Sequence, residues 1–156
     1  MKRKYVFFLL LIVPMFLFGC DNKNTTSKSV VCKKTMPYND TQIKWNNEIN
    51  IQYKDETIEN IEIKEIITVD PSVDEDRIAS FKNMIELECT GDLGRKFDSC
   101  NLTGEGNVFT ITMTTKKIEV LDSAISSSQD GANLDGSSIE TLKDYLKKLE
   151  YTCERA

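Results

Sequence analysis

The chain has 156 residues, enough for one small domain with a single core. It carries 20 basic and 25 acidic residues and no histidine, and its net charge is −5. No basic stripe is available to neutralise phosphates, so we expect no nucleic-acid binding. The lack of histidine removes the usual general base, the commonest metal ligand and the serine–histidine nucleophile pairs. We therefore expect neither enzymatic activity nor a cofactor.

The N-terminus has the layout of a bacterial signal peptide. Basic residues at positions 2–4 precede an apolar run over 5–18, which is shorter than the roughly 20 residues of a comfortable membrane span. The run ends in Leu17-Phe18-Gly19-Cys20, which resembles the lipobox of bacterial prolipoproteins, although that family usually has a smaller residue in place of Phe18. The resemblance implies removal of residues 1–19 and acylation of the Cys20 thiol. An ordinary secretory signal is the alternative interpretation.

The segment after this cut has the composition of a flexible tether over residues 20–29, and a single domain is expected over 30–156. Removing residues 1–19 takes away three of the 20 basic residues, which leaves 17 against 25 acidic ones and a net charge of −8. Anionic lipid repels such a domain. We therefore expect the acyl chains on Cys20 alone to hold it at the extracytoplasmic face of the cell membrane.

Four further cysteines, Cys32, Cys89, Cys100 and Cys153, form an even set, which outside the cytoplasm predicts two disulfides. Sequence alone does not choose among the three possible connectivities. We favour Cys89 with Cys100, which closes a short loop, and Cys32 with Cys153, which staples the first ordered segment to the last. A zinc site of four thiolates is the alternative, but the C-x-x-C spacing of such sites and of redox-active pairs is missing.

In chain order, the first predicted elements are strands. A short strand is predicted over 30–34, and two long ones over 43–53 and 58–69 are joined by a turn at 54–57. In the long strands, apolar and polar residues alternate, as in a sheet with one wet face. The positions predicted to face inward are Ile43, Trp45, Ile49, Ile51, Tyr53, Ile61, Ile63, Ile67 and Val69.

The hydrophobic period then changes to that of a helix. Ser72 and Glu75 form a capping box before an apolar stripe that ends at Cys89. A second hairpin is predicted over 100–114. Residues 116–126 are ambiguous, with a weak helical pattern, and 127–138 read as a loop. A final helix starts at a Ser137 and Glu140 capping box, and a short strand closes the chain at 151–153. These elements predict an α+β fold, in which two or three helices cover one face of an antiparallel sheet of about four to five strands.

Two groups of oxygen-bearing side chains are candidates for a Ca2+ site. Asp70, Asp74, Glu75 and Asp76 stand at the start of the first predicted helix, where the helix dipole favours negative charge without any ligand. Residues 133–136 match the middle of an EF-hand loop but lack its first aspartate and its bidentate glutamate. We favour structural roles for both groups and expect no metal.

The aromatic residues Trp45, Tyr38 and Tyr53 are close enough in sequence to make a stacking surface for a glycan or a peptide. The alternative, which we favour, is that they serve the core and the hairpin. No S-x-x-K pair of a serine–lysine hydrolase occurs.

The lipobox, the Cys32-Lys33-Lys34-Thr35 strand, the order of sheet then helix and the closing Glu150-Tyr151-Thr152-Cys153 together resemble the YehR-type small lipoproteins, whose function is unknown. This resemblance implies an antiparallel sheet packed by helices and supplies no activity. Two hypotheses follow from the whole sequence. The first is a binding or interaction module at the cell envelope, whose partner is an envelope protein or peptide. The second is a lipoprotein that captures a solute or a metal.

Overall fold

The computed structural model describes residues 26–36, 40–125, 134 and 137–156. These residues form six strands, three α-helices and one short 3-10 helix. In chain order they are β1 (Lys28–Met36), β2 (Ile43–Lys54), β3 (Thr57–Val69), α1 (Glu75–Thr90), η1 (Gly94–Lys96), β4 (Ser99–Glu105), β5 (Val108–Thr115), α2 (Ile118–Ile125), α3 (Ile139–Lys148) and β6 (Thr152–Arg155). Within these described segments, no helix is long and apolar enough to cross a membrane.

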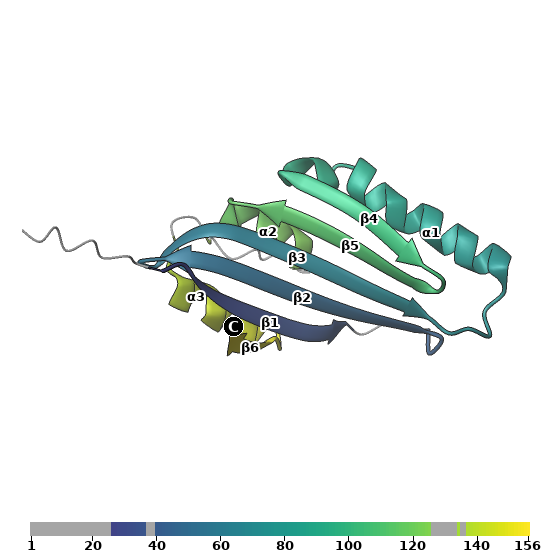
Figure 1. Ribbon diagram of the computed structural model, residues 1–156, viewed down its shortest axis with the longest axis horizontal. Coiled ribbons are helices and arrows are strands. Elements are labelled where there is room, and N and C mark those ends of the chain that lie inside the picture. Colours follow the sequence, from purple (N-terminus) through teal and green to yellow (C-terminus); the bar gives the residue numbers. More distant parts are fainter. Residues whose placement is uncertain (1–25, 37–39, 126–133, 135–136) are drawn as a thin grey trace, which may run out of the picture.

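The strands form one antiparallel sheet in the order β4-β5-β3-β2-β1-β6, and this confirms the α+β class. The sheet has more strands than the four to five expected, because the short C-terminal strand β6 pairs with the edge of β1. Figure 1 shows the sheet facing the viewer, with α2 and α3 behind it and α1 along the β4 edge. β1 begins at Lys28, inside the segment 20–29 that was expected to be a tether, because Lys28 and Ser29 pair with β2.

The hairpin β2–β3 is the longest pairing in the sheet, and it follows the predicted alternation. Ile49 pairs with Ile63 and Ile51 with Ile61, and all four side chains are fully buried. The turn residues Asp55 and Glu56 have φ angles of 47° and 68°. Two successive left-handed residues suit a two-residue hairpin, since this backbone twist matches that of the strands.

The helices α1, α2 and α3 pack on one face of the sheet, which we call the inner face. Buried side chains of these helices, among them Ile85, Leu121 and Leu146, share one core with the isoleucines of β2 and β3. Within the ambiguous segment 116–126, residues Ile118–Ile125 form the helix α2. The other face, which we call the outer face, carries the polar residues of the same strands.

Both main helices begin at a cap other than the one predicted. The Asp74 carboxylate accepts the Arg77 backbone N–H at 2.8 Å and caps α1, whereas the Ser72 hydroxyl hydrogen-bonds with the side chain of Asp70. Ser138, not Ser137, caps α3. Each true cap lies closer to the first helical residue, which lets its side-chain oxygen reach a free N–H of the first turn.

Two disulfides staple the domain, with the predicted pairing. Cys32 in β1 lies directly opposite Cys153 in β6, and their bond ties the first strand to the last. Cys89, near the end of α1, is bonded to Cys100 in β4. Because all four thiols are used in these bonds, the zinc alternative is ruled out. Structural disulfides of this kind are typical of extracytoplasmic proteins.

Candidate functional site

Two polar residues interrupt the apolar inner face of the sheet at the same level. Asn47 in β2 and Glu65 in β3 are direct partners in the strand register, and both point inward among isoleucines. Asn47 is 2% exposed and Glu65 is 6% exposed. Side chains of directly paired residues have Cβ atoms about 4.5–5.5 Å apart, so the amide and the carboxyl are neighbours in the core.

Tyr151 adds a third buried polar group near this pair, since the charge of Glu65 acts on its hydroxyl and its ring lies 5.7 Å from Nζ of Lys34, the strand partner of Asn47. It lies between α3 and β6, is 4% exposed, and is held by a backbone hydrogen bond from its N–H to the Leu146 carbonyl. Within the described part of the chain, no hydrogen-bond partner reaches Asn47 Oδ1, Glu65 Oε2 or Tyr151 Oη. We call these three atoms the oxygen cluster.

Glu65 has a strongly shifted pKa. Burial raises the pKa of its carboxyl to about 7, the negative charge of Glu88 on α1 pushes it in the same direction, and hydrogen bonding by the Trp45 side chain opposes the rise. Near neutral pH the carboxyl therefore changes its charge. Glu88 and Trp45 are both partly exposed and connect the oxygen cluster to solvent.

The other charges near the oxygen cluster do not compensate Glu65. Burial, together with the charge of Glu65, raises the pKa of the Tyr151 hydroxyl, and burial raises that of Glu88. Lys34 lies in the same row across the sheet, paired with Asn47. Its Nζ donates to the Leu149 carbonyl at 2.7 Å and lies 5.7 Å from the centre of the Tyr151 ring. Lys34 is thus engaged at the rim rather than bonded to the carboxyl of Glu65.

At this site three buried oxygens lack a partner among the described residues, although the Tyr151 hydroxyl can itself donate and the Trp45 side chain hydrogen-bonds the Glu65 carboxyl. Leaving a buried polar group unpaired costs roughly 1–3 kcal/mol. Three such oxygens together are expensive for a domain whose total stability is about 5–15 kcal/mol. A proton on Glu65, or a ligand that brings N–H or O–H donors, relieves this cost. The site is therefore suited to binding a hydrogen-bond donor.

Comparisons with known proteins give little further information. No family model matches the chain, and no curated protein matches it either. Among solved structures, it is similar to a protein described as "NMR structure of the protein from Streptococcus pneumoniae TIGR4". The identity is 17%, the match covers 81% of this chain and 85% of that chain, and the TM-score is 0.37. The resemblance to YehR-type lipoproteins therefore stays a prediction.

The predicted site residues lie away from the oxygen cluster. The lipid-attachment candidate Cys20 lies outside the described residues, and Cys32, Cys89, Cys100 and Cys153 are in disulfides. Of the candidate loop 133–136, only the buried Leu134 is described.

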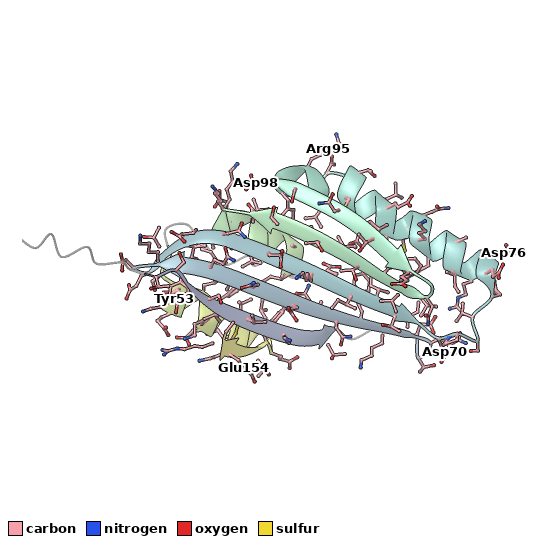
Figure 2. All side chains as sticks on the ribbon, in the orientation of Figure 1. Tyr53, Asp70, Asp76, Arg95, Asp98 and Glu154 are labelled. Carbon is pink, nitrogen blue, oxygen red and sulfur yellow. A yellow bond between two sulfur atoms is a disulfide. The ribbon has the colours of Figure 1, made fainter. Side chains whose placement is uncertain are left out.

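The acidic candidates lie just before α1 and in its first turn, at the end of the molecule where Figure 2 labels Asp70 and Asp76. Asp70 accepts hydrogen bonds from the backbone and the side chain of Ser72, which lower the pKa of its carboxyl. Asp74 caps the helix. Among the residues described, no group of three or more acidic, cysteine or histidine side chains is placed to hold a metal ion.

The two aromatic candidates that the structure describes, Trp45 and Tyr53, do not come together into a stacking surface. Trp45 and Tyr53 lie eight residues apart on β2, which is about 26 Å along a strand. Figure 2 shows Tyr53 at the end of the sheet far from Asp70. Tyr38 lies outside the described residues. Trp45 instead lies beside Glu65, where its indole helps to set the pKa of the carboxyl.

Analysis of the sequence missed the oxygen cluster, although a signal was present. Positions 47 and 65 fall at inward-facing parity in two strands that otherwise place apolar residues there. Each polar interruption, taken alone, is ordinary. Counting outward from the hairpin turn places Asn47 opposite Lys64, and only the register shift between Gln52 and Tyr53 brings it opposite Glu65, so the clue in the sequence was limited to the two interruptions themselves.

The outer face of the sheet is a second feature with a possible role in binding. It is polar and carries, among others, Asn46, Glu48, Asn50, Glu62, Lys64, Thr110, Thr112 and Thr114. Its charges are largely paired, since Lys33 Nζ lies 2.9 Å from Glu48 Oε2 and Lys64 Nζ lies 2.9 Å from Glu62 Oε1. A hollow of about 430 Å³ lies beside β1 and β2, and its lining includes Lys33 and Glu48 together with the inward-facing Asn47.

Proposed function

We propose that this protein is an extracytoplasmic binding module, tethered to a membrane by acyl chains on Cys20, that holds a small ligand at the oxygen cluster. The short apolar N-terminal run, the Gly19-Cys20 junction and the polar segment that follows support the anchor. The two disulfides support a location outside the cytoplasm.

One observation carries the ligand-binding part of the proposal. Three segments of the chain, namely β2, β3 and the turn before β6, each bring one buried oxygen without a partner among the described residues to the same part of the core. A core selected only for folding would fill these positions with apolar side chains, because isoleucine surrounds them. Convergent polar groups among apolar walls are typical of small-molecule sites.

The anchor is tested by the intact mass of protein purified from its native membrane, before and after reduction with alkylation. We expect a loss of residues 1–19, an acylated Cys20, and four thiols that react only after reduction. Cys20→Ser should release the protein from the membrane fraction. An unmodified Cys20 in the native protein would contradict the anchor.

The binding site is tested by the small molecules that remain on the protein during purification. Native mass spectrometry of the wild-type protein is compared with that of Glu65→Gln, and Glu62→Gln serves as the matched control on the outer face of the same strand. We expect a bound species, or stabilisation by a metabolite extract, that is present in wild type and control and lost in Glu65→Gln. Equal behaviour of all three proteins would refute a ligand site at Glu65.

A second candidate function is docking of an envelope protein or peptide on the outer face. The described helices pack on the inner face, so none of them covers the outer face, and the hollow beside β1 offers a place for a side chain. Charge reversal at Glu48, which lines this hollow, should then reduce the recovery of a cross-linked partner from intact cells. Unchanged cross-linking would count against this role.

A further inference from the structure

The oxygen cluster matches the donor pattern of one ligand group. A primary ammonium carries three N–H donors and no acceptor. The oxygen cluster offers three oxygens, Asn47 Oδ1, Glu65 Oε2 and Tyr151 Oη, and each lacks a partner among the residues that the structure describes. We propose that the oxygen cluster binds the primary ammonium group of a slender alkyl amine, and this identification rests on the binding function proposed above.

The charges around the cluster favour a cation. Glu65 and Glu88 face each other from β3 and α1, and the nearest described lysine of this row, Lys34, is held by the Leu149 carbonyl. The partly exposed Trp45 ring lies at the same place, and aromatic faces attract ammonium groups. At longer range, the charge of −8 expected after removal of residues 1–19 draws cations toward the domain.

Other occupants satisfy the cluster less well. A proton on Glu65 lets the carboxyl donate one hydrogen bond, to Asn47 or to Tyr151 but not to both. A calcium ion takes about six to eight oxygen ligands, and the described surroundings hold no metal-binding group of three or more carboxylates. A quaternary ammonium has no N–H to donate. The low exposure of all three side chains favours an ammonium group on a narrow chain over a bulky head group.

Binding is expected to be linked to protonation of Glu65. The carboxylate form pairs with the ammonium, so binding releases the proton that Glu65 holds at lower pH. The titratable groups that face Glu65 are Glu88 from α1 and Tyr151 from the C-terminal turn, and Lys34 lies at the rim on β1. Because the pKa of Glu65 is about 7, affinity should rise about tenfold per pH unit below that value and level off above it.

Trp45 is the single tryptophan of the chain and lies beside Glu65, so its fluorescence reports on the site directly. The test titrates detergent-purified, disulfide-intact protein at pH 8 with n-butylammonium. Tetramethylammonium, n-butanol and calcium chloride serve as matched probes. We expect a saturable fluorescence change with n-butylammonium and none with the other three. This discrimination is measured on the wild-type protein and does not depend on the folding of any variant.

Variants then assign the response to the oxygen cluster. Glu65→Gln should weaken n-butylammonium binding at least about tenfold, and Tyr151→Phe several-fold, as expected for hydrogen bonds to a charged group. The controls Glu62→Gln and Tyr53→Phe should leave it unchanged. Circular dichroism verifies the fold of each protein.

The outcomes separate this inference from the proposed function. A response to calcium or tetramethylammonium equal to that for n-butylammonium overturns the amine identification. If n-butylammonium gives no response while a metabolite extract is bound in a Glu65-dependent way, the amine is refuted and the binding function stands. If neither binds, both proposals fail.

Discussion

Glu65→Gln should change how the stability of this protein depends on pH. The pKa of Glu65 is raised from 4.5 to about 7 on folding, chiefly by burial. Between these two values the folded state therefore binds more protons than the unfolded state, and stability falls as pH rises. Below pH 4.5 the carboxyl is neutral in both states and carries no penalty. Above pH 7 the penalty is complete. Glutamine keeps the shape of the neutral acid and cannot ionise, so the variant lacks this loss.

The size of the effect follows from the shift in pKa. A shift from 4.5 to about 7, at 1.36 kcal/mol per unit, corresponds to about 3 kcal/mol. Because Glu65 is only 6% exposed, solvent screens this penalty little. We therefore expect Glu65→Gln to match the wild type within about 1 kcal/mol at pH 4.5 and to be more stable by up to about 3 kcal/mol at pH 8.

The measurement is urea unfolding at pH 4.5, 6, 7 and 8, followed by far-UV circular dichroism with both disulfides intact. Glu88, whose pKa is also raised by burial, adds a slope of the same sign to both proteins. The difference between wild type and variant at each pH therefore isolates Glu65. Glu62→Gln is the control on the outer face of the same strand. A difference that stays constant from pH 4.5 to 8 would refute the argument, because it would mean that Glu65 does not change its charge over this range.

Three further variants test the two disulfides and the start of α1 by denaturant unfolding. Replacing Cys32 and Cys153 by serine removes a bridge between residues with a sequence separation of 121. By the loop-entropy relation this should lower the free energy of unfolding by about 5 kcal/mol. A variant that keeps most of its stability would contradict that relation for this protein. The same change at Cys89 and Cys100, with a separation of 11, should cost about 3 kcal/mol and loosen the contact between α1 and β4, as measured by hydrogen exchange. Asp74→Ala should lower the free energy of unfolding by about 1 kcal/mol, since it removes the side chain that caps α1. An equal loss in Ser72→Ala would instead support the capping box that the sequence predicts.

Much of this fold follows from local patterns. The period of two over 43–53 and 58–69 placed the long hairpin, and the even set of cysteines outside a signal sequence predicted two bridges. The predicted helix caps lie one or two residues too early. Ser72 and Asp74 before α1, and Ser137 and Ser138 before α3, all have a side-chain oxygen that can accept from a free N–H of the first turn, so the sequence does not choose between them. The order of the strands in the sheet could not be predicted from local patterns, because β3 pairs with β5 and β1 pairs with β6, and these segments lie far apart in the chain.

The oxygen cluster was missed for the same physical reason. Asn47 and Glu65 become neighbours through the register of β2 and β3, which depends on the turn at Asp55 and Glu56 and on a one-residue register shift between Gln52 and Tyr53. Tyr151 joins them only because β6 returns to the edge of β1. A buried polar site that is assembled from three segments leaves only single polar interruptions in the sequence, and each of these looks like an ordinary loss of alternation.

Replacing both members of the Asn47–Glu65 pair by leucine separates folding from binding. When both polar partners in a core are exchanged for apolar groups of similar shape, the result is close to neutral or stabilising. We expect the double variant to unfold at least as late in urea as the wild type at pH 8, where Glu65 carries its full penalty, and to show a smaller advantage at pH 5. It should also lose the response of Trp45 fluorescence to n-butylammonium. A loss of more than about 2 kcal/mol at pH 8 would show instead that the pair is structural. A gain in stability with loss of binding would mean that these two residues serve the ligand at the expense of the fold, which is the compromise expected of a functional site rather than of a core.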